Sequence, residues 1–335
     1  MIGLIRVAVK LGAVAIMASA GVAQVSEHKS VPNRAEMTQA LAPLHNLSED
    51  WLVSIALNDR NHAYIVSRDG AIMKTADGGN SWSRIEPFYT GHTRWFRDIA
   101  SIDRNTAWVV GNQGLILKTT DGGETWADQS FSTKVDLFSV SFQNSQNGYA
   151  VGGDGVVLHT EDGGATWTPQ ASSTKSYLFD VAAVNDTTAW AVGSKGTVIR
   201  TTDSGKTWVT MTTDPSINLH ALSTAGPNQI WAVGGPGMIL KSADGGETWQ
   251  RQNSSTNRML LSTYALNEST AWACGADGLV LHTRDGGNSW LKQETQAGSF
   301  LYGIAATEAS NIWAVGNLGT IVASQNMGRT WHKLP

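Results

Sequence analysis

A short polar turn that ends in tryptophan occurs seven times along this chain of 335 residues. One copy reads TTDGGETW, and every copy keeps a glycine and the closing tryptophan. The tryptophans are 44 residues apart in the first interval and 41 in each of the next five. A fixed period in this range indicates a repeat architecture, in which each unit buries its apolar face on its neighbours. The closing residues are Trp82, Trp126, Trp167, Trp208, Trp249, Trp290 and Trp331.

Each repeat contains four short segments rich in β-forming residues. An apolar run such as LFSVSF comes first, AWAVG-like and TVIRT-like segments follow, and the last segment starts at the tryptophan. We name the four predicted strands a, b, c and d. Units of about 40 to 45 residues with four strands are typical of propeller blades. The sequence therefore predicts an all-β, seven-bladed β-propeller over residues 51–335, with four antiparallel strands per blade and the repeated turn between strands c and d.

The repeated turn is expected to stabilise the fold. An aspartate side chain at its start accepts hydrogen bonds from nearby backbone N–H groups, and the glycines adopt positive φ angles. The tryptophan then packs at the start of strand d. A catalytic role for one copy would have to account for the other six, so we assign a structural role to Asp77, Asp121, Asp162, Asp203, Asp244, Asp285 and Asn326.

The N-terminal segment differs in composition from the repeats. Arg6 and Lys10 precede a short apolar run that ends in small residues, which predicts a secretory signal peptide over residues 1–23. Cleavage after Ala20 and cleavage after Ala23 both fit. The alternative is an uncleaved anchor, but the run is shorter than the roughly 20 apolar residues of a membrane span. We expect an exported protein without direct membrane insertion, in the periplasm or, in a photosynthetic source, the thylakoid lumen.

Residues 24–50 form an N-terminal extension that either stays loose or lends a strand to close the ring. A formal charge of −4, spread along the chain, argues against nucleic-acid binding. The sole cysteine, Cys274, lies where other repeats have valine, so we expect a small buried apolar side chain rather than a reactive thiol. The histidines are not clustered as in zinc sites, and we expect a monomer with no metal and no cofactor.

The turn D-x-G-x-T-W resembles the Asp-box, or BNR repeat, of sialidases and other propellers. Together with the 41-residue spacing, the pattern AWAVG..G.I..T.DGG.TW over residues 51–334 resembles the seven-bladed photosystem II assembly-factor family. This resemblance implies a non-enzymatic scaffold that holds membrane proteins outside the cytoplasm or in the thylakoid lumen. The family is also associated with an arginine-rich patch, for which this sequence offers a sparse equivalent in Arg68, Arg94 and Arg97.

A binding site is expected on one face of the ring. Because strands alternate in direction, the d–a and b–c connections share one face, and the Asp-boxes lie on the other. The first d–a connection holds the three extra residues of the longer interval and is rich in aromatic and arginine residues, a composition typical of interaction hot spots. We predict partner contacts by Tyr89, His92, Arg94, Trp95, Arg97 and, from blade 1, Arg68.

Two local alternatives accompany this prediction. Trp95 and Phe96 could instead pack between blades 1 and 2. Arg97 occupies a strand-a position that is aromatic in other repeats, so its guanidinium needs a carboxylate, either Asp98 or Asp136, or faces the central channel.

Catalysis is the rival class of function. A sialidase needs an arginine triad, a tyrosine nucleophile with a glutamate partner, and a separate acid, all on enlarged loops. Blades of 41 residues leave no room for such loops, so we expect no enzyme activity. A carbohydrate-binding propeller stays open as an alternative. The main hypothesis is a non-enzymatic scaffold that binds a membrane-protein complex or transporter subunit through the face with the d–a and b–c connections.

Overall fold

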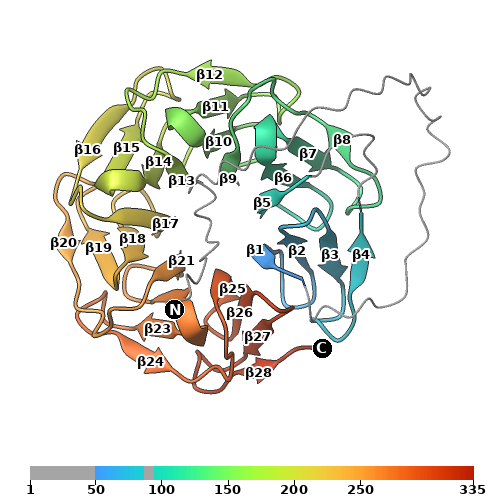
Figure 1. The fold of residues 1–335 in the computed structure, drawn as a ribbon, viewed down its shortest axis with the longest axis vertical. Helices are drawn as coiled ribbons and strands as arrows, with labels where there is room; N and C mark the ends of the chain where they lie inside the picture. Colours follow the sequence, from blue (N-terminus) through green and yellow to red (C-terminus); the bar gives the residue numbers. More distant parts are fainter. Residues whose placement is uncertain (1–49, 87–93) are drawn as a thin grey trace, which may run out of the picture.

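The computed structural model describes residues 50–86 and 94–335, which form seven four-stranded antiparallel sheets around a central axis (Figure 1). Each sheet consists of four strands that are consecutive in the chain. The predicted seven-bladed propeller is confirmed. The innermost strands a are β1 (Leu52–Leu57), β5 (Phe96–Ser101), β9 (Leu137–Phe142), β13 (Leu178–Ala183), β17 (Asn218–Thr224), β21 (Leu260–Ala265) and β25 (Leu301–Glu308).

Strands b and c form the buried middle of each blade, since nearly all of their residues are buried. Strands b are β2 (Ala63–Ser67), β6 (Ala107–Gly111), β10 (Gly148–Gly152), β14 (Ala189–Gly193), β18 (Ile230–Gly235), β22 (Ala271–Gly275) and β26 (Asn311–Gly316). Strands c are β3 (Ile72–Thr75), β7 (Ile116–Thr119), β11 (Val157–Thr160), β15 (Thr197–Thr201), β19 (Met238–Ser242), β23 (Val280–Thr283) and β27 (Ile321–Ser324).

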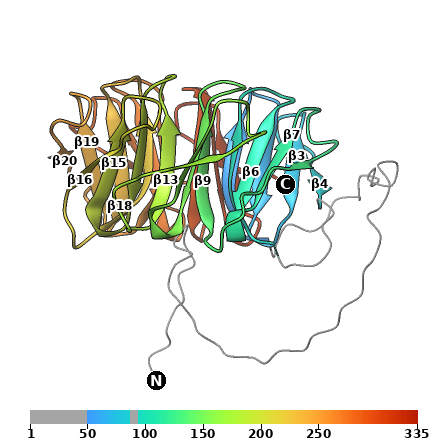
Figure 2. The same ribbon diagram turned by 90° about the horizontal axis from the view of Figure 1, so that it is seen from above.

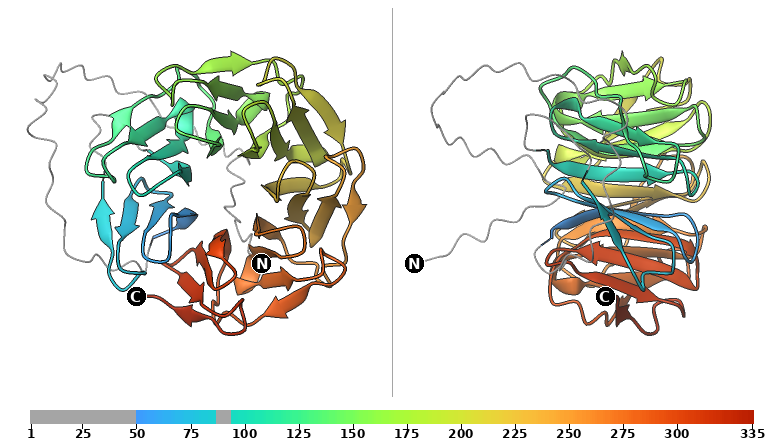
Figure 3. Two further views of the ribbon diagram at one scale, coloured as in Figure 1. Left: turned by 180° about the vertical axis from the view of Figure 1, so that it is seen from behind. Right: turned by 90° about the vertical axis from the view of Figure 1, so that its right-hand side faces the viewer.

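The outermost strands d are short, which limits the unpaired edge that each blade presents to solvent. Figure 2 and Figure 3 show that all strands cross the thickness of a flat disc. Strands d are β4 (Ser83–Ile85), β8 (Ala127–Asp128), β12 (Thr168–Gln170), β16 (Val209–Thr212), β20 (Gln250–Arg251), β24 (Leu291–Gln293) and β28 (His332–Lys333). Short 3-10 turns between strands b and c are η3 (Asn112–Gly114), η4 (Gly153–Gly155), η5 (Ser194–Gly196) and η6 (Ala276–Gly278).

The Asp-box turn has the predicted hydrogen bonds. In blade 3, the Thr166 N–H donates to Asp162 Oδ1 at 2.8 Å, and the Thr166 hydroxyl donates to Asp162 Oδ2 at 2.7 Å. Thr160, at the start of the turn, donates to Asp162 and accepts from the Gly164 N–H at 2.7 Å. In blade 7, Asn326 accepts the same backbone hydrogen bond at 2.9 Å. In blade 3, the conformation of the turn is therefore stabilised by the hydroxyls of Thr160 and Thr166 as well as by the carboxylate of Asp162.

The Asp-box tryptophans join neighbouring blades. Trp126 of blade 2 packs edge-on against Tyr64 of blade 1, with ring centroids 6.5 Å apart. Each tryptophan lies one residue before the assigned strand d, so the prediction that strand d starts at the tryptophan is off by one residue. The ring closes through the same contact, because Trp82 of blade 1 packs edge-on against Trp313 of blade 7 at 5.9 Å.

The two ends of the ring meet without sharing a sheet among the described residues. Strand β1 packs directly on β25, and a core cluster spans blades 1 and 7. The Gly319 N–H also donates to the Asp50 carbonyl at 2.9 Å. The predicted signal peptide and residues 24–49 lie outside the described residues, so their roles stay predictions. Within the described part, no helix is long and apolar enough to cross a membrane.

Candidate functional site

Hydrogen bonds between connections define the two faces of the disc. The Gly122 N–H of an Asp-box donates to the Asn105 carbonyl of the a–b turn at 2.9 Å, so these two kinds of turn share one face. On the opposite face, the Asn112 N–H of a b–c turn donates to the Trp95 carbonyl of a d–a connection at 3.0 Å. The predicted assignment of faces is confirmed. We call the face with the d–a and b–c connections the mouth face.

The glycine near the end of most strands b fixes the residue that enters strand a of the same blade. Gly193 is extended, and a Cβ there would lie 1.9 Å from the Tyr177 carbonyl oxygen. The d–a connection thus crosses this glycine at a distance that excludes a side chain. The Ser194 N–H then donates to the same carbonyl at 2.9 Å. Equivalent positions at the entry to strand a form an outer ring on the mouth face; six lie just before the strand and Asn218 is the first residue of β17. The ring consists of Trp51, Trp95, Asp136, Tyr177, Asn218, Met259 and Phe300.

Two residues after the outer-ring position, each strand a contributes one residue to a second ring, which lies deeper. Phe138 lies 5.8 Å from Phe179 between ring centroids, and Phe179 lies 6.1 Å from His220. The deeper ring is mostly apolar or aromatic and mostly buried. Its members are Val53, Arg97, Phe138, Phe179, His220, Leu261 and Tyr302. We call the connected group of Trp51, Arg68, Trp95, Arg97, Asp136, Phe138, Tyr177 and Phe179 the mouth cluster.

Arg97 is the charged member of the deeper ring, and its side chain is almost fully buried. Its guanidinium donates to Asp136 Oδ2 at 3.0 Å and lies 5.7 Å from the Phe138 ring centroid. Of the two carboxylates considered from the sequence, Asp136 is therefore the partner. Asp98 instead accepts hydrogen bonds from the Ser54 and Ser139 hydroxyls. Arg97 thus ties blade 2 to the entry of blade 3.

Arg68 belongs to the b–c turn of blade 1 and lies over two indole rings. Its guanidinium carbon is 5.1 Å from the ring centroid of Trp51 and 5.1 Å from that of Trp95. Both distances are within the range of cation–π attraction. Burial lowers the pKa of Arg68, and the positive charge of Arg97 lowers it further. The mouth cluster therefore holds two neighbouring guanidinium groups, of which Arg97 has a carboxylate partner.

A buried polar network supports the mouth cluster from below. The Ser139 hydroxyl lies 2.7 Å from Asp98 Oδ2 and 2.7 Å from Asp180 Oδ1. Asp180 also accepts the Leu222 N–H at 2.9 Å. These contacts connect strands a of blades 2 to 5 immediately beneath the deeper ring. Because the Ser139 hydroxyl has a single proton, it donates to one of the two carboxylates at a time, and the network links neighbouring blades beneath the mouth cluster.

The predicted site residues divide into three groups. Arg68, Trp95 and Arg97 come together in the mouth cluster, and Arg94 directly precedes Trp95 in the same connection. Trp95 packs on both arginines and still exposes 39% of its surface, so packing and exposure coexist at this position. Tyr89 and His92 lie outside the described residues.

Five members of the mouth cluster were missed from the sequence as site residues: Phe138 and Phe179 of the deeper ring, and three of the outer ring. Trp51 and Tyr177 were not singled out, and Asp136 was considered only as a partner of Arg97. All three occupy the outer-ring position before strand a, as Trp95 does. Aligning the repeats at that single position would have brought them together, since four of its seven residues are aromatic.

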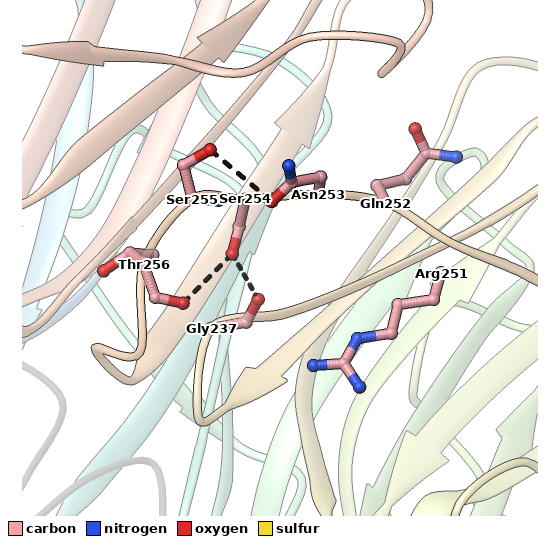
Figure 4. Close-up of a pocket in the computed structure, with 7 residues that line it drawn as sticks. All are labelled: Gly237, Arg251, Gln252, Asn253, Ser254, Ser255 and Thr256. Carbon is pink, nitrogen blue, oxygen red and sulfur yellow. Dashed lines mark hydrogen bonds between the residues drawn. The ribbon is translucent and has the colours of Figure 1, made fainter.

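A pocket of about 310 Å³ lies elsewhere on the mouth face, beside blade 5 (Figure 4). Ser254 donates to the Gly237 carbonyl at 2.6 Å. Ser172 and Thr295 make the equivalent bond in blades 3 and 6, so this contact belongs to the repeat. Among the described residues, no group of three or more His, Cys, Asp or Glu side chains is placed to hold a metal ion.

The fold and the mouth cluster define a seven-bladed Asp-box propeller with an aromatic and arginine-bearing mouth. The model of the photosynthesis system II assembly factor YCF48 family matches residues 36–135, 90–175, 168–241 and 226–334. The chain belongs to this family. Among curated protein sequences, none matches the chain.

Solved structures share the fold. A structure of YCF48 bound to D1 peptide is 24% identical and covers 71% of this chain and 81% of that one, with a TM-score of 0.60. YCF48 from Cyanidioschyzon merolae is 18% identical, with coverage of 83% and 96% and a TM-score of 0.69. An ancestral GH74 enzyme is 16% identical and covers 87% of this chain but 47% of its own, with a TM-score of 0.69.

Proposed function

We propose that this propeller is a non-enzymatic assembly factor that holds an extramembrane segment of a membrane-protein subunit on its mouth face. Membership of the YCF48 family and the likeness to a YCF48 structure bound to D1 peptide support a role in protein binding. The mouth cluster is the observation that carries the proposal. It joins arginines to aromatic side chains in one place, the composition of residues that dominate binding energy at protein interfaces.

Two side chains of the cluster are accessible to a partner. Trp95 is 39% exposed and Tyr177 is 38% exposed, whereas Arg97, Phe138 and Phe179 are buried beneath them. The buried members keep the exposed rings in place, which lowers the entropic cost of binding. A partner would therefore meet a rigid aromatic surface next to a partly exposed arginine.

The test is capture of partners from chemically crosslinked membranes with the tagged full-length protein. One sample carries Trp95→Ala together with Tyr177→Ala. The matched control carries Val209→Ala together with Leu291→Ala, since these side chains are 61% and 66% exposed on the outer strands, away from the mouth. We expect one membrane complex with the unmodified protein and the control, and its loss with the mouth variant. Equal recovery with both variants would remove the mouth face from the function.

The alternative function is carbohydrate binding or sialidase-like glycoside cleavage. Hydrolysis of chromogenic glycosides by the purified protein would refute the non-enzymatic assignment. Glycan-array binding without recovery of any membrane protein would favour a carbohydrate-binding propeller instead.

The proposed role also requires export. Fractionation of cells that produce the tagged protein should place it outside the cytoplasm. Its intact mass should show removal of residues 1–20 or 1–23. A protein with its full N-terminus in the cytoplasm would contradict both the export and the assembly role.

A further inference from the structure

Cationic side chains in strands c tie several blades to the Asp-box of the next blade. The Lys118 ammonium of blade 2 donates to the Gly163 carbonyl of blade 3 at 2.9 Å. The acceptor is the first residue after the Asp-box aspartate, and we call such a bond a clip. The equivalent clips are those from Arg200 to Gly245 at 2.9 Å and from Lys241 to Gly286 at 2.8 Å.

The interface between blades 6 and 7 is held in a different way. His282 occupies the strand-c position of these cations, and Met327 stands where the clipped turns have glycine. The His282 imidazole stacks on the Trp272 indole, with ring centroids 4.5 Å apart. Gln293 of strand d makes the bond to the next blade instead, because its amide nitrogen donates to the Met327 carbonyl at 3.1 Å. A neutral side chain therefore makes the link that a cation makes elsewhere.

The amide of Gln293 also determines which nitrogen of His282 carries the proton. The Trp331 indole N–H can only donate, and it lies 3.3 Å from Gln293 Oε1, so the amide oxygen faces the indole. The amide nitrogen then faces His282 Nδ1 at 3.2 Å, which makes Nδ1 an acceptor and places the ring proton on Nε2. In the described part of the chain, the indole N–H groups of the other six Asp-box tryptophans have no hydrogen-bond partner.

A proton on Nδ1 of His282 would disrupt this arrangement. The new N–H would face the amide N–H groups of Gln293, so two donors would meet without an acceptor. To accept that proton, the amide would have to turn over. Its bond to the Met327 carbonyl and its bond from the Trp331 indole would then both be lost. Protonation of one ring thus breaks both contacts of Gln293 with the Asp-box of blade 7.

The surroundings of His282 oppose its protonation while the interface is closed. Among the described residues, Arg284 on the same strand is the charged group that acts on it. Strands b and d present Trp272 and Gln293, and the Asp-box of blade 7 has Asn326 in place of an acid. Burial, followed by the charge of Arg284, lowers the pKa of His282 to about 4. An opened interface would restore the ordinary value of 6.5, so closure weakens as the pH falls from 6.5 to about 4.

We infer that His282 and Gln293 form a proton-sensitive latch between blades 6 and 7, which holds the last Asp-box at neutral pH and releases it in acid. This inference concerns the conformation of the ring and does not depend on the proposed function. The released turn belongs to the blade that closes the ring, where Trp82 packs against Trp313 at 5.9 Å. Release would therefore loosen one side of the closing blade, while the clipped interfaces stay in place.

Hydrogen exchange of the full-length protein at pH 7 and pH 5 tests the latch. Protection of residues 324–331, corrected for the intrinsic pH dependence of exchange, should fall about twentyfold, as expected for a pKa of about 4 in the closed form and 6.5 in the open form. The Asp-box of blade 3, residues 160–167, is the internal reference because Lys118 clips it. It should keep its protection, since hydrogen bonds from Thr166 lower the pKa of Asp162 to about 2.

A paired substitution tests the residues of the latch. His282→Lys together with Met327→Gly installs the combination found at Lys241 and Gly286, so a cation should hold the turn at both pH values and the fall should disappear. Met327→Gly alone is the matched control. It should keep the fall, because Gln293 binds the main-chain carbonyl at this position. Gln293→Leu should leave the turn weakly protected at both pH values.

Three results would overturn the inference. Equal loss of protection in both Asp-boxes would mean that acid loosens the whole ring. Unchanged protection of residues 324–331 would mean that His282 does not control the turn. A fall that persists in the variant with His282→Lys and Met327→Gly would assign the response to another group. The comparison of the two turns in the unmodified protein decides the matter even if a variant does not fold.

Discussion

At the scale of single residues, the mouth cluster shows how one substitution in a repeat is accommodated. Arg97 occupies a position that is aromatic or aliphatic in the other blades, where the neighbours bury it. The buried charge of Arg97 is tolerated because Asp136, at the entry to the next blade, accepts a hydrogen bond from the Arg97 guanidinium at 3.0 Å. The pair is therefore a local solution, made by residues 39 positions apart, to the cost of a buried cation.

Replacing Asp136 with Asn should therefore destabilise the protein. The change leaves the Arg97 guanidinium buried without a counter-charge, for which we expect a loss of about 3 kcal/mol in the free energy of unfolding. Urea unfolding followed by tryptophan fluorescence measures it. The control is Arg104→Gln, because Arg104 is an exposed partner of Asp59 and its loss should cost less than about 1 kcal/mol. Equal effects would mean that the buried pair contributes no more than an exposed one.

The Asp-box offers a second test at this scale. Asp162→Asn should change stability little, because Asn326 already accepts the equivalent backbone N–H in blade 7. Asp162→Ala removes the acceptors of both the Thr166 N–H and the Thr166 hydroxyl, and should lower the thermal unfolding temperature clearly below that of the Asn variant. Thermal melts of the two variants side by side decide the matter, and identical melts would show that the turn does not depend on this acceptor.

At the scale of elements, the end of strand b controls where the site residues lie. The extended glycine at this point lets the d–a connection cross directly above it, and the carbonyl of the outer-ring residue is then fixed by the next N–H. The glycine of the AWAVG segment therefore has a positioning role for Trp95, Asp136 and Tyr177. Blades 2 to 7 all have glycine at this position because the backbone of the d–a connection approaches it closely, and not because the φ angle is unusual.

Gly193→Ala should disturb this crossing. The new Cβ would fall 1.9 Å from the Tyr177 carbonyl oxygen, so the connection must shift, at a cost of about 3 kcal/mol. Gly298→Ala is the matched control, since no atom lies within 4 Å of the new Cβ and its φ is not positive, and its effect should stay within about 0.5 kcal/mol. Chemical denaturation compares the two, and a tolerated Gly193→Ala would contradict the crossing as described.

The elements also show what the sequence could and could not predict. Blade number, strand order and the Asp-box were predictable because they depend on contacts within about forty residues, repeated seven times. The contact of Arg68 with Trp51 and Trp95 was not, because it joins a b–c turn to two different d–a entries. Repeat spacing gives the position of each residue along its blade, but not which side chains of neighbouring blades meet. Asp136, by contrast, was one of two carboxylates that the sequence offered to Arg97.

At the scale of the whole molecule, the interfaces between blades contain buried histidines. His220 lies in the deeper ring, and its Nδ1 is 2.9 Å from the Leu260 carbonyl of the next blade. Burial lowers the pKa of His220 to about 4, and the hydrogen bond to Leu260 opposes this shift. Burial, followed by the charge of Arg284, also lowers the pKa of His282 to about 4. Both side chains are therefore neutral in the folded ring at neutral pH.

Stability should consequently fall on acidification. Below the ordinary histidine pKa of 6.5 the unfolded chain binds protons that the folded protein does not, so the folded state loses stability down to about pH 4. For His220 the loss is about 3 kcal/mol, from 1.36 kcal/mol per pKa unit. Unfolding free energies measured from pH 7 to pH 4 should show this slope. His220→Phe, the residue type found at Phe138 and Phe179, should flatten it, and an unchanged slope would contradict the assignment.

The construction of each sheet from four consecutive strands has a consequence for how such rings evolve. Duplicating or deleting a stretch of the gene that encodes 41 residues adds or removes one complete sheet together with both of its packing surfaces. No remaining sheet has to exchange a strand, because the junction of blades 7 and 1 uses the same tryptophan contact as the others. The mouth cluster draws on only some of the blades, so lineages can change the size of the ring and the chemistry of its mouth in separate steps.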